Sequence, residues 1–336
     1  MSIRSDLSIN PSRFHPDNVA EPTKQANTLL EGLSSRGPRW YEVGAAEYRQ
    51  MRDQGKLPLP APTYLPNAVD ATLPSRDSSR AIPIRVYKPD NGEPSKGVFL
   101  HFHGGGFVLG NEKSSDKVLQ MFANGVQLTA ISVGYRHAPE DPYPAAVHDS
   151  IDAAEYLVDH PSIYGPVRFM GGESAGACLV VLATLHLLHW RPSHVLSGLI
   201  LHYGFYDLSL GLPALATSTR PLMVNRTALE HFTEAYLPGV TPDERRSPSI
   251  SPIYADFPAL AAGSANGLPP ALFIVGTEDC LLDDTILLGT KWRIAGGESL
   301  VQFYPGASHG FTVMPGLPVA EEANAASVRF LQERVG

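Results

Sequence analysis

The feature that most constrains the fold is a regular alternation of short apolar runs with longer segments of helical periodicity. The apolar runs predict strands, because they are short and bounded by turn residues. They lie at residues 82–87, 98–103, 128–135, 167–170, 198–203, 271–275 and 300–304. The helical patterns lie between or after them, at residues 116–124, 145–157, 175–190, 284–295 and 321–333. This alternation predicts an α/β fold, in which helices cover both faces of a mostly parallel sheet.

Two stretches of the chain interrupt the alternation. The first has helix-compatible segments at 24–35 and 40–54, then alternating prolines at 57–62 that favour extended chain. The second is rich in Pro, Ser and Ala and has one clear helical pattern, at 226–236. We expect a helical cap to form there. The chain is therefore divided into an N-terminal cap segment at 1–65, an α/β domain at 66–203 and 271–336, and a cap insertion with its connection at 204–270.

Composition and charge exclude several classes of protein. The net charge of −8 has the wrong sign for binding nucleic acid or an anionic membrane surface. Two cysteines cannot form a disulfide scaffold, and they have no partners at metal-ligand spacing. Residues 1–18 contain no apolar run typical of a signal peptide, and no stretch approaches the length of a membrane span. We expect a soluble, cytoplasmic protein that binds neither a metal nor a cofactor.

Residues 172–176 read Gly-Glu-Ser-Ala-Gly and lie between a predicted strand and a predicted helix. A serine at the tip of such a tight turn has a strained backbone, so the residues two positions away must be small. The helix that follows favours negative charge beside the serine. The pentapeptide also arises by chance in glycine-rich turns, but its position between strand and helix makes Ser174 a candidate nucleophile.

A glycine-rich loop follows the predicted strand at 98–103. Residues 103–107 read His-Gly-Gly-Gly-Phe, and successive glycines leave backbone N–H groups free to point at a substrate oxygen. Gly104 and Gly105, together with the N–H of Ala175, could form an oxyanion hole. The alternative is a loop that binds phosphate. However, no Gly-Lys-Ser/Thr follows, and the spacing differs from the dinucleotide-binding pattern.

Four acidic residues follow the strand at 271–275: Glu278, Asp279, Asp283 and Asp284. Asp283 and Asp284 stand where a helix begins, so capping and the helix dipole explain them without catalysis. Glu278 and Asp279 remain as candidates for a catalytic acid.

The candidate base is His309. It lies just beyond the last predicted strand, between Gly306 and Gly310, in a loop that can project its side chain. A neutral imidazole can accept a serine proton at neutral pH. His186 and His189 lie three residues apart on a predicted helix, but no third metal ligand follows them at a recognisable spacing.

Five motifs together resemble the hormone-sensitive-lipase-like family of α/β-hydrolase carboxylesterases. They occur in family order and extend the resemblance over residues 75–335. They are His-Gly-Gly-Gly at 103–106, Tyr-Arg-His-Ala-Pro-Glu at 135–140, Gly-Glu-Ser-Ala-Gly at 172–176, Asp-Cys-Leu-Leu-Asp-Asp at 279–284 and Ser-His-Gly-Phe at 308–311. The resemblance implies a capped α/β-hydrolase fold with a triad of Ser174, Asp279 and His309. It favours Asp279 over Glu278, which matches no position in the family pattern.

Some positions depart from that pattern. Glu173 stands where the family often has Asp or Thr, Ala177 where it often has Gly, and Cys280 where it often has Pro. The first two could change the surroundings of Ser174 without removing a catalytic group. By the resemblance, His103 steadies the oxyanion loop. We expect Arg136 to brace loops rather than to bind substrate.

The expected activity is that of a serine carboxylesterase that hydrolyses small, fairly apolar, short-acyl esters. We expect aromatic side chains near the cap to line the acyl or alcohol pocket. Candidates are Trp40, Tyr41, Phe107, Phe205, Tyr206 and Phe232.

Two alternatives stay open. The same residues could serve an amidase, lactonase, acyltransferase or dehydratase, since these reactions share early steps. By the resemblance, the chain could instead be a non-catalytic small-molecule receptor, since the family contains such receptors. Those receptors typically lose a triad residue, usually the histidine, whereas both Ser174 and His309 are present here. The chain could be a monomer or a homodimer.

Overall fold

The computed structural model describes residues 6–34, 36–58, 61–218 and 220–336. These residues form an eight-stranded sheet with the strand order β1-β2-β4-β3-β5-β6-β7-β8. The pairs β1–β2 and β2–β4 are antiparallel, and the remaining pairs are parallel. The strands are β1 Val69–Pro74, β2 Ala81–Tyr87, β3 Val98–Phe102, β4 Thr129–Val133, β5 Val167–Glu173, β6 Gly198–His202, β7 Ala271–Gly276 and β8 Ser299–Tyr304. The predicted α/β fold with a mostly parallel sheet is confirmed.

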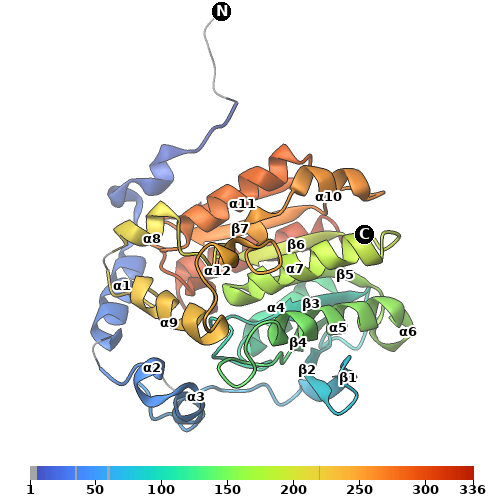
Figure 1. Cartoon of the computed structure of the whole chain (residues 1–336), viewed down its shortest axis with the longest axis horizontal. Helices are drawn as coiled ribbons and strands as arrows, with labels where there is room; N and C mark the ends of the chain where they lie inside the picture. The colour runs from blue at the N-terminus through green and yellow to red at the C-terminus, as the bar shows by residue number, and fades with distance from the viewer. Residues whose placement is uncertain (1–5, 35, 59–60, 219) are drawn as a thin grey trace, which may run out of the picture.

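Helices cover both faces of the sheet (Figure 1). One face packs against α5 Ala145–Asp159, α7 Ala175–Trp190 and α11 Leu282–Ile294. The opposite face packs against α4 Asp116–Val126 and α12 Pro318–Gln332. A short helix, α6 Pro161–Tyr164, follows α5. The strands between these layers are buried on both sides, which is why they appear in the sequence as continuous apolar runs.

Helices α1, α8 and α9, which belong to the two stretches outside the alternation, lie on the same side of the molecule in Figure 1, whereas α10 of the insertion lies on the opposite side, beside α11. The indole of Trp40 stacks on Phe232, with ring centroids 4.9 Å apart, so the N-terminal segment contacts the insertion directly. The division into cap and α/β parts stays a prediction. The helices of these stretches are α1 Glu21–Ser34, α2 Trp40–Val43, α3 Ala45–Asp53, α8 Pro213–Thr217, α9 Arg226–Tyr236 and α10 Phe257–Gly263. Single 3-10 turns lie at η1 Pro11–Phe14, η2 Pro16–Asn18, η3 Glu244–Arg246, η4 Pro252–Tyr254 and η5 Phe311–Val313.

The short helices α6, α8 and α10 were not predicted, and two further differences between the structure and the sequence prediction have a clear physical reason. Strand β1 was not predicted, because among its residues only Leu73 is buried and the strand ends in a proline. The single helix expected at 40–54 is two helices, since Gly44 between them has φ +92°, which an α-helix cannot contain. The ends of two further predictions, residue 35 of a helix and residues 59 and 60 of the proline stretch, lie outside the described residues.

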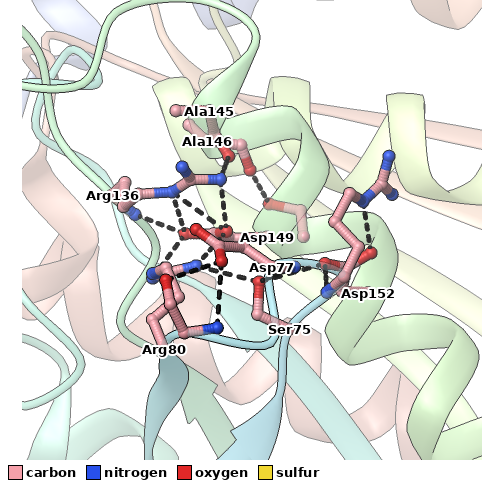
Figure 2. A network of polar contacts seen from close by, with 11 residues as sticks. Ser75, Asp77, Arg80, Arg136, Ala145, Ala146, Asp149 and Asp152 are labelled. Atoms are coloured by element: carbon pink, nitrogen blue, oxygen red, sulfur yellow. Dashed lines mark hydrogen bonds and ion pairs between the residues drawn. The ribbon is translucent and has the colours of Figure 1, made fainter.

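A buried ion-pair network fastens the loop after β4 to α5. Asp149 is fully buried and lies between the guanidinium groups of Arg80 and Arg136 (Figure 2). Arg80 donates to its carboxylate over 2.7 and 3.1 Å, and the backbone N–H of Arg136 donates over 2.9 Å. The prediction that Arg136 braces loops is confirmed.

We expect Asp149→Ala to lower the free energy of unfolding by about 3–5 kcal/mol, because it removes the buried carboxylate that both guanidinium groups bind. Urea unfolding measures the effect. The matched control is Asp243→Ala. It removes the ion pair between Asp243 and Arg246, in which the Asp243 side chain is 89% exposed. That control should change stability by about 1 kcal/mol at most. Equal losses in the two variants would contradict the prediction.

Candidate active site

Ser174 occupies a strained turn between β5 and α7. Its φ of 54° and ψ of −120° are rare for a residue with a side chain. The turn is tight because its neighbours approach β3. A Cβ at Gly176 would lie 1.9 Å from the carbonyl oxygen of Phe102, and one at Gly172 would lie 2.5 Å from the same atom. Only glycine fits at either position, as the sequence pattern predicted, and the turn lifts the Ser174 side chain above the sheet.

The side chains of Ser174, His309 and Asp279 form one continuous chain of hydrogen bonds. His309 Nε2 lies 2.9 Å from Ser174 Oγ, and His309 Nδ1 lies 2.9 Å from Asp279 Oδ2. All three residues are buried. Asp279 also accepts the Leu281 N–H over 2.8 Å, which fixes its orientation. A carboxylate that binds Nδ1–H leaves Nε2 free to accept a hydroxyl proton, so this arrangement can activate a serine.

The other three acidic candidates make contacts outside this chain of hydrogen bonds. Glu278 pairs with Arg220 across 3.2 Å. Asp283 accepts the Ala214 N–H over 2.7 Å. Asp284 accepts the N–H groups of residues 206 and 207, each over 2.8 Å, and burial raises its pKa well above the usual range. These two aspartates are in the first turn of α11, as predicted, but their hydrogen bonds hold the loop after β6.

The glycine loop after β3 lies beside Ser174. A Cβ at Gly104 would lie 3.4 Å from the Ser174 Cβ, and one at Gly105, where φ is +120°, would lie 2.0 Å from the Leu109 carbonyl oxygen. Within the described part of the chain, the N–H groups of Gly104 and Gly105 have no hydrogen-bond acceptor. Ala175 is the first residue of α7, where a helical N–H has no partner within the helix. These donors are therefore available to a bound ligand.

His103 supports this loop from below. Burial lowers the pKa of His103 well below its usual value, so the ring is neutral. Its Nδ1 lies 2.8 Å from the Gly104 carbonyl oxygen, and the ring stacks on Tyr135. The Tyr135 hydroxyl in turn donates to the His103 carbonyl oxygen over 2.7 Å. These contacts agree with a steadying role for His103 in the loop.

The three aromatic residues proposed to bind substrate are almost fully buried. Phe107 stacks on Tyr236 with centroids 4.0 Å apart, and the Phe205 N–H donates to the Ser174 carbonyl oxygen over 3.2 Å. A substrate contact for Phe107, Phe205 or Tyr206 stays a prediction.

A cavity of about 560 Å³ lies beside the glycine loop and was not predicted. Its walls come from the N-terminal helices, the loop after β3, the loop after β4 and the insertion, so no single motif could reveal it. Met223, one of the lining residues, also faces Gly310 next to His309. Lining residues include Tyr48, Arg49, Asp53, Tyr64, Leu109 and Met223.

Among the described residues, no three His, Cys, Asp or Glu side chains gather as metal ligands would. No helix in the described ranges combines the length and apolar character needed to cross a membrane.

A sequence model of the alpha/beta hydrolase fold matches residues 99–313, which contain the nucleophile turn, the glycine loop, Asp279 and His309. The chain belongs to this α/β-hydrolase family. Ethyl acetate hydrolase of Pseudomonas putida is 26% identical, over 97% of this chain and 98% of its own length. Carboxylesterase NlhH of Mycobacterium tuberculosis is 30% identical, over 87% of this chain and 88% of its own length.

A solved structure supports the same placement within the α/β-hydrolases. An esterase from the bacterial hormone-sensitive lipase family superposes with a TM-score of 0.76 at 27% identity, covering 95% of this chain and 99% of that one. The resemblance to hormone-sensitive-lipase-like carboxylesterases drawn from the five sequence motifs is therefore confirmed.

Proposed function

We propose that this α/β-hydrolase is a serine carboxylesterase that hydrolyses small, short-acyl esters through an acyl-enzyme. The observation that carries the proposal is the buried chain of hydrogen bonds from Ser174 through His309 to Asp279. The free N–H groups beside Ser174 supply the second requirement of acyl transfer, a site for the oxyanion. Relatives named as carboxylesterase and ethyl acetate hydrolase support the same reaction class.

In the acylation step, His309 Nε2 accepts the Ser174 hydroxyl proton while Oγ attacks the ester carbonyl. The oxyanion that forms accepts hydrogen bonds from the N–H groups of Gly104, Gly105 and Ala175. Each such donor contributes about 100- to 1000-fold to the rate. Asp279 stabilises the imidazolium, which then protonates the departing alcohol.

In the deacylation step, a water molecule takes the place of the alcohol. His309 removes a proton from the water, and the water oxygen attacks the acyl carbonyl. The oxyanion that forms accepts hydrogen bonds from the same N–H groups. Collapse of the tetrahedral intermediate releases the carboxylic acid and returns the proton to Ser174. No metal or organic cofactor takes part in this sequence.

The cavity beside the glycine loop is a candidate for part of the substrate pocket, because its lining residue Met223 lies next to Gly310, although neither Ser174 nor His309 lines it. At about 560 Å³ the cavity is within the range of pockets that bind drug-sized molecules, and the aromatic rings of Tyr48 and Tyr64 give it apolar wall area. Arg49 fixes one wall, since it donates to the Val108 carbonyl oxygen over 2.7 Å and pairs with Glu140. We propose that the N-terminal segment and the insertion together limit the length of the acyl chain.

The test measures hydrolysis of p-nitrophenyl esters from acetate to palmitate, together with amide and lactone substrates and labelling by a fluorophosphonate probe. We expect hydrolysis of the acetate and butyrate esters, little of the palmitate, and label on a peptide that contains Ser174. Faster turnover of amides or lactones would assign a different reaction to the same site. A protein that is folded but not labelled would instead be a receptor.

A further inference from the structure

Beneath the nucleophile turn lies a buried pair of ionisable side chains that the proposed reaction does not use. Glu173 is the last residue of β5 and directly precedes Ser174. Its two carboxylate oxygens lie 3.0 and 2.9 Å from Nε2 of His101, on the neighbouring strand β3. The side chains of His101 and Glu173 are only 2% and 9% exposed. Because a carboxylate only accepts hydrogen bonds, the Nε2–H of His101 must be the donor.

The pair continues across the sheet in both directions. Nδ1 of His101 lies 3.0 Å from Ser132 Oγ on β4. On the other side of Glu173, its register partner on β6 is His202. His202 contacts Thr312 Oγ1 over 3.2 Å, three residues after His309. Polar side chains from four adjacent strands therefore form a row below Ser174.

Glu173 keeps the tendency to ionise despite its burial. Burial alone would raise the pKa of Glu173, but the facing His101, together with His202 and a backbone hydrogen bond, outweighs burial, and the pKa is lowered from its usual value. A buried polar contact of this kind is weak evidence for a role in stability, since apolar side chains of similar size would often stabilise a fold equally well. The location of the pair, one residue before a strained serine, indicates a role in geometry.

The strained turn needs restraints on both sides. After Ser174, the backbone is held because the Phe205 N–H donates to the Ser174 carbonyl oxygen. At Ser174 itself, the N–H donates to the His202 carbonyl oxygen over 2.9 Å. Before Ser174, the side chain of Glu173 is tied to His101. A backbone conformation of this kind persists only when its surroundings enforce it.

We propose that the Glu173–His101 pair positions the nucleophile: it ties the residue before Ser174 to β3, and so fixes the direction in which Oγ points towards His309. The inference rests on the proposed function. Glu173 and His101 are positioning residues, because neither contacts the reacting atoms. An error of about 1 Å in the place of a reacting atom can cost about 100-fold in rate, so a loosened turn slows the reaction without weakening ester binding.

The test compares kcat, KM and the rate of fluorophosphonate labelling in Glu173→Gln and His101→Asn. Gln keeps the shape of Glu but loses its charge, and Asn is too short to reach the carboxylate. We expect kcat and the labelling rate to fall together by about 10- to 100-fold in either variant, with KM nearly unchanged. The double variant should be no slower than the slower single one, since both changes act on the same contact. Glu173→Asp, which keeps the charge on a shorter side chain, should recover part of the rate.

The matched control is Asp116→Asn. Asp116 forms a similarly buried ion pair with Arg85, on a helix away from the nucleophile. This variant should lower the melting temperature and leave the labelling rate of the folded protein unchanged. If Glu173→Gln and His101→Asn behave like this control, losing stability only or nothing at all, the inference is wrong. Failure of the proposed function gives a different result, because the unaltered protein would then neither hydrolyse esters nor take the label.

Discussion

Ser174→Ala should abolish ester hydrolysis, with kcat falling by about 10⁴- to 10⁶-fold. Among the described residues, the alanine removes the one oxygen that hydrogen-bonds to His309 Nε2, at 2.9 Å. The His309–Asp279 contact and the N–H donors of the glycine loop remain. They account for the small residual rate above the uncatalysed reaction. Hydrolysis of p-nitrophenyl acetate by the purified protein measures the loss.

The control for this prediction is Ser249→Ala. Ser249 is exposed and its hydroxyl lies 3.2 Å from that of Tyr143, far in sequence from every residue of the proposed triad. Activity in that variant should equal that of the unaltered protein. Ser174→Ala should also retain its melting temperature, since the change removes one atom from a turn whose backbone is held by other contacts. If it kept more than about one hundredth of the activity, another group would have to be the nucleophile.

The fold was predictable where the buried face of an element is visible as a pattern in the sequence. Helix α9, Arg226–Tyr236, has the predicted bounds, because an apolar stripe on one face and Asn225 as its N-cap both appear in the sequence. Strand β1 gave no such signal, because it is an edge strand that is mostly exposed. The break at Gly44 depends on a positive φ, which the sequence permits but does not require.

The site was predictable to the extent that its residues follow strands. In a parallel sheet the carboxyl ends of strands meet at one edge, so motifs after β3, β5, β7 and β8 come together without further information. Contacts between side chains on neighbouring strands could not be predicted in the same way, because they depend on the register of the strands. His101 faces Glu173 only because His101 pairs with Gly171, two residues earlier on the same face of β5. The contact of Arg220 with both Glu31 and Glu278 likewise joins three segments that no motif relates.

Asp279→Asn should lower kcat by about 10⁴-fold with little change in the fold. An asparagine amide can turn its N–H₂ towards His309 Nδ1, which then acts as acceptor, and the proton moves to Nε2. That tautomer cannot accept the Ser174 proton. The loss should be in kcat for esters and in the rate of fluorophosphonate labelling, because both begin with the same proton transfer.

Glu278→Gln is the matched variant, since Glu278 is the adjacent carboxylate that the sequence alone could not exclude. Its side chain is 40% exposed and pairs with Arg220, so its loss should change kcat by no more than a few-fold. A larger loss in Glu278→Gln than in Asp279→Asn would assign the acid to Glu278. The ratio of the two rates therefore separates a carboxylate that orients the imidazole from one that only joins the insertion to the loop beside it.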